Sequence, residues 1–172
     1  DRLRAAPNEP PSLDKVAEIA GVARSTIYTT FGSRAGLFEA FTTDLWERNG
    51  LADVTAAVEV SDARAHLRGG LRAACRMLAG DLEVYLVLFS MTRLDPASLG
   101  GAVESKERHR SGGMAYLAQR LADQGALRPG ISPEHAADLL WMLCSFEAFD
   151  PLHSGRGMSV DEAAQALADT AE

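Results

Sequence analysis

Apolar residues recur at helical spacing along almost the whole chain, and this periodicity restricts the fold more than any other feature of the sequence. No segment shows the strict alternation of apolar and polar residues that predicts a half-buried strand. Glycine, proline and capping residues divide the pattern into pieces of helix length. We therefore predict an all-α protein with a small N-terminal domain, residues 1–49, and a larger helical body, residues 50–172.

The N-terminal domain is predicted to contain short helices separated by glycine turns. Ser12 is the expected N-cap of a helix that Gly21 ends, because glycine adopts the left-handed conformation of a helix terminus at little cost. A second helix is expected at 24–31. Ser33 can cap a third helix, which fades near Gly50.

The body is predicted to consist of longer helices with clear start and stop signals. The apolar run 84–89 is compatible with a buried strand by itself, but the helical patterns on both sides favour a helix. Ser132-Pro133 is typical of a helix start, and Ser159 with Glu162 fits a capping box. The glycine pairs 100–101 and 112–113 can bend or interrupt the helix expected at 97–124. The expected helices are 62–79, 81–93, 97–124, 133–150, which stops before Pro151, and 160–171.

A helix, a glycine turn and a second short helix form the pattern of a DNA-binding helix-turn-helix. Ile27 and Phe31 share the inward face of the second helix, and its other residues are small, polar or basic. No acid occurs between Ile19 and Phe38, although the chain has 24 acids and a net charge of −7. Such a surface suits contact with phosphates. The side chains expected to point outward are Arg24, Ser25, Thr26, Tyr28, Thr29 and Thr30.

The stretch from Leu13 to Phe38 resembles the DNA-binding signature of the TetR family of transcriptional regulators. The segment 125–130 and the helix after it are similar to the effector domain of that family. The pieces shared with the signature are Ile19-Ala20-Gly21-Val22, Thr26-Ile27-Tyr28, Phe31, Ser33-Arg34 and Leu37-Phe38.

The resemblance implies specific roles in DNA binding. It implies that Arg24, Ser25 and Thr29 face bases. The residues implied to hold phosphates are Ser12, Thr26, Tyr28, Thr30 and Arg34. The chain departs from the family at Thr29 and Thr30, where His and Tyr are usual, and Arg34 replaces the usual Lys. The family also has a helix before this motif, of which residues 1–6 can supply only the end.

The body is predicted to form a homodimer. The segment Leu139–Phe146 has no charge, and a helix that is apolar all round must be covered on all sides. A four-helix interface between two copies would cover it, and the family resemblance implies the same arrangement. A core within one chain is the alternative. The expected interface residues are Leu139, Leu143, Phe146, Val160, Ala163, Ala164 and Leu167.

A ligand pocket is expected between the body helices, for a small apolar or aromatic effector. Plain core packing is the alternative for each of its residues. The candidate lining is Met77, Tyr85, Phe89, Met91, Tyr116, Trp141 and Phe146. A stripe of arginines beside the face of Leu67 and Leu71 indicates an anionic ligand, a docking surface, or a solvated face paired with acids on neighbouring helices. These are Arg64, Arg68, Arg72 and Arg76, hereafter the arginine stripe.

Other function classes find no support. There is no apolar run of membrane length, no secretion signal, no metal-ligand spacing and no catalytic motif. We therefore expect no cofactor, no metal and no enzyme activity. The predicted protein is a bacterial cytoplasmic repressor with three partners: palindromic operator DNA, a second copy and a small-molecule effector. A ligand-independent DNA-binding regulator and a small-molecule enzyme are the alternatives.

Overall fold

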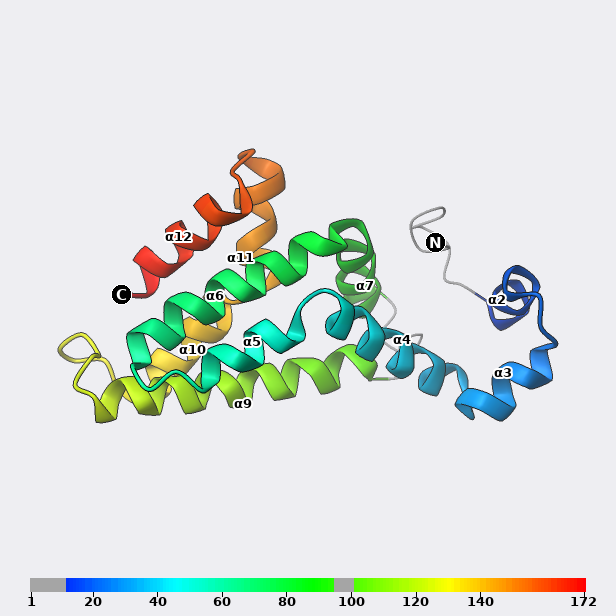
Figure 1. Cartoon of the computed structure of the whole chain (residues 1–172), viewed down its shortest axis with the longest axis horizontal. Coiled ribbons are helices and arrows are strands. Elements are labelled where there is room, and N and C mark those ends of the chain that lie inside the picture. Colours follow the sequence, from blue (N-terminus) through cyan, green and yellow to red (C-terminus); the bar gives the residue numbers. More distant parts are fainter. Residues whose placement is uncertain (1–11, 95–100) are drawn as a thin grey trace. The chain divides into compact units, whose positions relative to one another are not determined.

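The computed structural model describes residues 12–94 and 101–172, and every regular element within these ranges is helical, so the predicted all-α class is confirmed (Figure 1). In chain order the elements are α2 (Leu13–Ala20), α3 (Arg24–Phe31), α4 (Arg34–Arg48), α5 (Leu51–Val58), α6 (Ala63–Gly80), α7 (Leu82–Leu94), α9 (Ala102–Asp123), α10 (Pro133–Leu143), α11 (Phe146–Asp150), a π-helical turn (Pro151–Gly155) and α12 (Val160–Ala171).

The helices pack as two units. Unit 1 contains the described residues of Asp1–Trp46 and Asp81–Lys106, and unit 2 contains Glu47–Gly80 and Glu107–Glu172. The chain first passes from unit 1 to unit 2 between Trp46 and Glu47, close to the predicted domain boundary after residue 49. The return of residues 81–106 to unit 1 is not among the sequence predictions.

Local signals account for the first helices. The Ser12 hydroxyl accepts the Lys15 N–H at 3.2 Å and caps α2, and Gly21 ends that helix with a φ of +66°. Gly32 ends α3 with a φ of +73°, and the Ser33 hydroxyl accepts the Gly36 N–H at 3.0 Å to start α4. The predicted boundaries of α2 and α3 are confirmed to the residue.

The rest of unit 1 is held by apolar contacts of α7. Tyr85 is fully buried and meets the ring of Trp46 edge-on, with 5.0 Å between ring centroids. Val84 and Leu88 are also buried, so the run 84–89 is the buried helix that its flanks predict.

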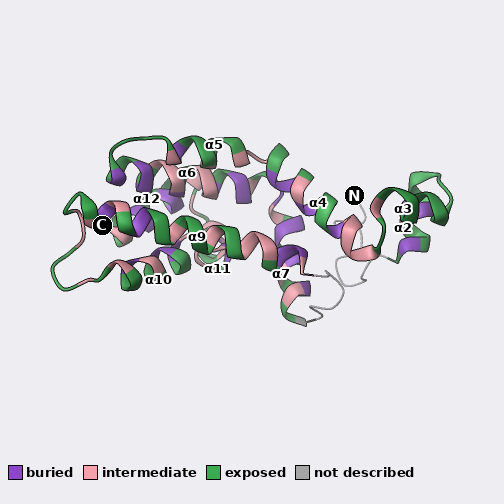
Figure 2. Cartoon of the chain, turned by 90° about the horizontal axis from the view of Figure 1, so that it is seen from below, coloured by how far each residue is buried: buried purple, intermediate pink, exposed green. Residues whose placement is uncertain are grey.

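Unit 2 is built around α6. Leu67, Leu71, Cys75 and Leu78 are buried on one face of this helix (Figure 2). Both α5 and α12 pack extensively against α6. Burial of this face is the main apolar contribution that joins the helices of the unit.

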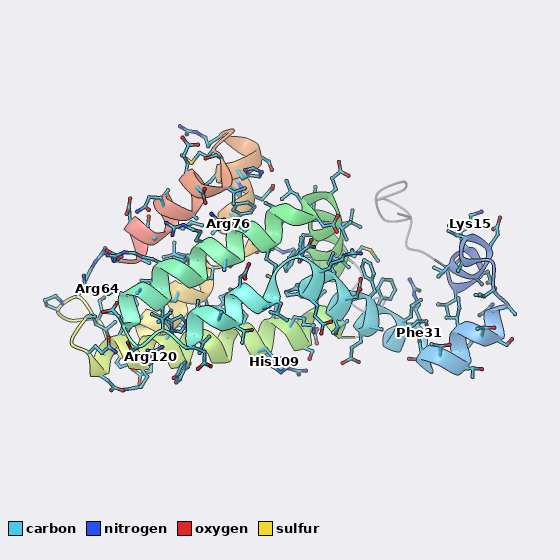
Figure 3. All side chains as sticks on the ribbon, viewed as in Figure 1. Lys15, Phe31, Arg64, Arg76, His109 and Arg120 are labelled. Carbon is cyan, nitrogen blue, oxygen red and sulfur yellow. The ribbon has the colours of Figure 1, made fainter. Side chains whose placement is uncertain are left out.

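Arg120 of α9 and Gln124, which follows that helix, bind the connection between α5 and α6 (Arg120 is labelled in Figure 3). Arg120 donates to the carbonyl oxygens of Val58 at 3.0 Å and Ser61 at 2.8 Å. Its Nη1 also lies 3.0 Å from Nδ1 of His66, which is buried. Gln124 accepts the Ala63 N–H at 2.9 Å, so a backbone donor at the start of α6 is satisfied by a side chain.

Two predictions about the body helices are wrong. The helix predicted for 133–150 ends at Leu143, because Ser145 adopts an extended conformation and its hydroxyl caps a new helix, α11, by accepting the Ala148 N–H at 3.1 Å. Helical structure also continues through Pro151, which lies in the first turn of the π-helical segment, where its missing N–H is tolerated.

Other differences concern α5 and α9. α5 is not predicted from the sequence, which has an alanine-rich segment there but no capping side chain. α9 begins at Ala102 and passes through Gly112 and Gly113 without interruption. The predicted helix stop at Asp95-Pro96 and the first residues of the predicted 97–124 helix lie outside the described residues.

We predict that Gly21→Ala destabilises the protein by about 1–2 kcal/mol, because a Cβ is strained in the left-handed conformation. Gly112→Ala is the matched control. It lies in a helix with no atom within 4 Å of an added Cβ, and alanine should stabilise it by about 0.5–1 kcal/mol. Chemical unfolding followed by circular dichroism measures both. Equal effects of the two substitutions would contradict the left-handed turn.

We also predict that His66 makes the free energy of unfolding fall below about pH 6.5. Burial, and then the charge of Arg120, lower the pKa of His66 in the folded state. The unfolded chain therefore takes up a proton first as the pH falls, and stability is lost between the unfolded and the folded pKa. Unfolding of the wild type and of His66→Gln between pH 7.5 and 5.5 should show a steeper loss for the wild type. Parallel pH profiles would contradict this assignment.

Candidate nucleic-acid interface

A small apolar cluster fixes α2 against α3. Leu13, Ala17 and Ile27 are buried in it, and Phe31 packs at its edge. Because the inward positions of both helices are used by this contact, the remaining positions of α3 face solvent. The exposed residues of α3 are Arg24, Ser25, Thr26, Tyr28, Thr29 and Thr30, as the sequence predicts.

The start of α3 carries no capping side chain and no acid in its first turn. Its first N–H groups and the positive end of its helix dipole are therefore available to an anion. Tyr28, one turn into the helix, keeps 42% of its surface exposed. The arrangement offers a row of hydrogen-bond donors on one exposed helix.

Arg24 is already engaged by a residue outside the set predicted to bind DNA. Its Nη1 contacts both carboxylate oxygens of Asp14 at 2.9 Å, and its Nη2 donates to the Tyr28 hydroxyl at 3.3 Å. The hydrogen bond to Tyr28, and then the charge of Asp14, raise the pKa of Arg24. The ion pair links α2 to α3, and it must open or rotate before Arg24 can bind DNA with its full set of donors.

Two hydroxyls of the predicted site have local partners. Ser12 accepts a backbone N–H as the cap of α2, so its O–H remains free to donate to a phosphate. The Thr29 hydroxyl donates to the Ser25 carbonyl oxygen at 2.9 Å. Thr29 therefore reaches a base mainly as an acceptor or through its methyl group.

Arg34 lies at the start of α4 and is half-buried. Its guanidinium carbon is 5.7 Å from the ring centroid of Phe38. Its Nε and Nη2 are covered and have no hydrogen-bond partner within the described part of the chain. The structure thus holds this cation against an aromatic ring next to α3.

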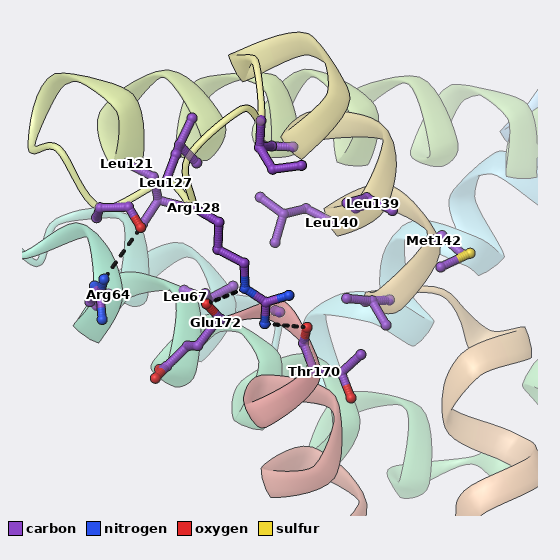
Figure 4. A pocket seen from close by; sticks show the side chains of 15 residues that line it. Arg64, Leu67, Leu121, Leu127, Arg128, Leu139, Leu140, Met142, Thr170 and Glu172 are labelled. Carbon is purple, nitrogen blue, oxygen red and sulfur yellow. Dashed lines mark hydrogen bonds between the residues drawn. The ribbon is translucent and has the colours of Figure 1, made fainter.

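The residues predicted to line a ligand pocket do not come together in one unit. Tyr85, Phe89 and Met91 belong to unit 1, and Met77, Tyr116, Trp141 and Phe146 belong to unit 2. Tyr116 and Trp141 are exposed. Unit 2 does contain a cavity of about 270 Å³, and it is lined by other residues (Figure 4).

Most of the residues predicted for the dimer interface are covered within the chain itself. Ala163, Ala164 and Leu167 are buried in unit 2, where α12 packs against α6. Leu143 and Phe146 are buried as well, and Val160 is partly covered. Among the residues predicted for the interface, only Leu139 is exposed.

The arginine stripe is partly paired with acids, as its solvated-face interpretation requires. Arg68 forms an ion pair with Glu172, and Arg76 contacts Asp161 of α12 at 3.0 Å. Arg72 is exposed. Arg64 is exposed too and lines the cavity of unit 2.

The cysteines and possible metal ligands offer no further site. Cys75 and Cys144 are free thiols, and burial raises their pKa values to about 11 and about 12. Both are therefore poor nucleophiles. Across residues 12–94 and 101–172 no group of three or more His, Cys, Asp or Glu side chains is placed to hold a metal ion. No helix in these ranges is long and apolar enough to cross a membrane.

Comparisons with known proteins agree with the motif. The family model described as bacterial regulatory proteins, tetR family, matches residues 10–41. The chain is similar to the crystal structure of a TetR family transcriptional regulator, PfmR, from Thermus thermophilus, with a TM-score of 0.63 and 19% identity over 94% of this chain and 87% of that one. At this identity the likeness concerns the fold. No curated protein sequence matches the chain.

We predict that Asp14→Asn raises the affinity for duplex DNA about two- to fivefold, since it frees Arg24 from an ion pair that is exposed and therefore weak. Glu18→Gln is the matched control: it removes the same charge from α2 but acts on Lys15, its partner at 2.8 Å, and not on Arg24. Fluorescence anisotropy with labelled DNA at several salt concentrations measures both. If the two variants behave alike, the Asp14–Arg24 pair does not limit binding.

Proposed function

We propose that this chain, whose residues 10–41 match the model of the tetR family of bacterial regulatory proteins, is a repressor that binds a palindromic operator as a homodimer and releases it when a small apolar or aromatic molecule binds. It would act in the bacterial cytoplasm, where its DNA target lies. The observation that carries the DNA-binding part is the exposed polar face of α3, held outward by the buried contact of Ile27 with α2.

The contacts with DNA divide into two groups. Arg24, Ser25 and Thr29 are proposed to face base edges, and arginine is well suited to guanine because its guanidinium can bind O6 and N7 together. The proposed phosphate contacts are Ser12, Thr26, Tyr28, Thr30 and Arg34. Their hydroxyl and guanidinium groups are the donors that usually position a protein on the duplex.

A dimer is supported by the outer face of α10. Leu139, Trp141 and Met142 leave 39%, 44% and 53% of their surfaces exposed, which is unusual for neighbouring large apolar side chains. The guanidinium carbon of Arg110 lies 4.9 Å from the ring centroid of Trp141 and covers part of it. We infer that a second copy covers this face, so the interface uses α10 more than the stripe of α12. A twofold dimer would present two α3 helices to successive major grooves, about 34 Å apart.

Selection of bound duplexes from a randomised DNA pool tests the proposal with the full-length protein. We expect an enriched motif with two inverted half-sites about one helical turn apart. On that motif, Tyr28→Phe and Arg34→Ala should each reduce the slope of log affinity against log salt by about 0.9, the effect of one lost phosphate contact. Arg72→Ala, which is exposed in unit 2, is the control.

Light scattering on the same complex gives the number of copies bound. Failure to enrich any motif would contradict specific DNA binding. A motif without inverted halves, bound by a single copy, would contradict the dimer. Unchanged salt slopes for both variants would remove the phosphate roles of Tyr28 and Arg34.

A further inference from the structure

Asp14 and Arg24 join the two helices of the helix-turn-helix through their side chains. Asp14 lies in the first turn of α2, and Arg24 is the first residue of α3. Nη1 of Arg24 lies 2.9 Å from each carboxylate oxygen, and both side chains are mostly exposed. The buried contact of Ile27 with α2 holds the two helices together, so the carboxylate meets the start of α3 at a fixed place.

Tyr28 completes the surroundings of the Arg24 guanidinium. Its hydroxyl accepts a hydrogen bond from Nη2 at 3.3 Å, and its ring centroid lies 5.6 Å from the guanidinium carbon. Nε of Arg24 has no hydrogen-bond partner among the described residues, and Nη2 carries a second N–H. The edge formed by Nε and Nη2 is therefore open, whereas Nη1 is held by the carboxylate. A fork of two N–H groups of this kind can bind O6 and N7 of guanine together.

The charges of the helix-turn-helix are balanced. Residues 13–31 contain two acids and two bases, which are Asp14, Glu18, Lys15 and Arg24. Each base contacts one of the acids, at 2.8 and 2.9 Å. Binding to DNA of arbitrary sequence depends on cations that neutralise phosphates. Residues 13–31 by themselves therefore offer little attraction to the backbone of an arbitrary duplex.

We propose that Asp14 sets how strictly the protein selects its DNA sequence, because it directs Arg24 to a guanine edge and away from phosphates. A phosphate of any duplex competes with the carboxylate for Nη1, so the acid weakens contacts that carry no sequence information. A guanine can use the open edge of Nε and Nη2 while Nη1 stays on the carboxylate. Asp14 is thus a positioning residue for base reading. This role rests on the proposed function, because it needs a preferred DNA sequence.

Paired affinity measurements on the full-length protein test this role. Fluorescence anisotropy gives the affinities of the wild type and Asp14→Asn for the duplex selected by the wild type and for a shuffled duplex of the same composition. Asp14→Asn should bind the shuffled duplex about two- to fivefold more tightly, the effect of releasing one exposed ion pair. Its affinity for the selected duplex should change by less than about twofold, because the guanine contact does not need Nη1. The ratio of the two affinities should therefore fall.

Glu18→Gln is the matched control. It removes the same charge from an exposed position of α2 but frees Lys15, so it should keep the wild-type ratio. Equal falls in Glu18→Gln and Asp14→Asn would show that only the charge of α2 matters, and an unchanged ratio in Asp14→Asn would overturn the role of Asp14 while specific binding stands. If the wild type selects no sequence at all, the proposed function fails and the role of Asp14 fails with it.

A second set of measurements shows whether Asp14 acts through Arg24. In the Arg24→Gln background the carboxylate has no guanidinium to hold, so adding Asp14→Asn should leave the ratio unchanged. A fall in this background would mean that Asp14 acts directly on DNA, against the proposal. Replacing each guanine of the selected motif in turn with 7-deazaguanine removes its N7. At one position this should weaken the wild type about tenfold and leave Arg24→Gln unaffected. Equal weakening of both proteins at every position would overturn the guanine contact of Arg24.

Discussion

Burial of the apolar face of α6 is the contact on which unit 2 depends. Leu67, Leu71 and Leu78 lie on that face, and the helices that cover it come from residues 51–58 and 160–171, at opposite ends of the body. The same helix carries the arginine stripe, two of whose members pair with acids of the chain's C-terminal part. Apolar burial supplies the driving force, while exposed ion pairs of this kind contribute little to stability and mainly fix the register of the helices.

The apolar contact between α2 and α3 in unit 1 is small. The contact between α2 and α3 buries only Leu13, Ala17 and Ile27. So little buried area leaves a narrow margin, and the angle between the helices must be set by the backbone as well. The left-handed turn at Gly21 and the cap at Ser12 provide that constraint. The exposed residues of α3 are then not needed for the apolar contact, and their polar side chains are available for binding.

Arg24 is held in place before DNA binds. Asp14 and Tyr28 contact its guanidinium and position it. Such contacts reduce the rotamer entropy that a long side chain loses when it binds. The contact with Asp14 also has a cost, because Arg24 must give up this carboxylate before it can bind DNA with its full set of donors.

The sequence by itself determined the features that depend on neighbours in the chain. Periodicity predicts α2, α3, α6 and α12. The predicted caps of α2 at Ser12 and of α12 at Ser159 are confirmed, since a cap is a contact between residues three positions apart. The helix-turn-helix is likewise predicted from local signals. Helix α5 is not predicted, because no side chain caps its start.

Tertiary structure decided which apolar faces meet. The stripe of α12 could have packed on a second copy or on α6, and the pattern of Ala163, Ala164 and Leu167 is the same in both cases. The cavity of unit 2 is not predicted from the sequence. Residues of α6, α9, the loop 126–131, α10 and the end of the chain line it, and these segments leave a void only when they are packed together. The pairing of Asp14 with Arg24 requires the turn between two helices to bring them together. Local signals determine helices, whereas the choice among equally apolar partners is made only when the whole unit packs.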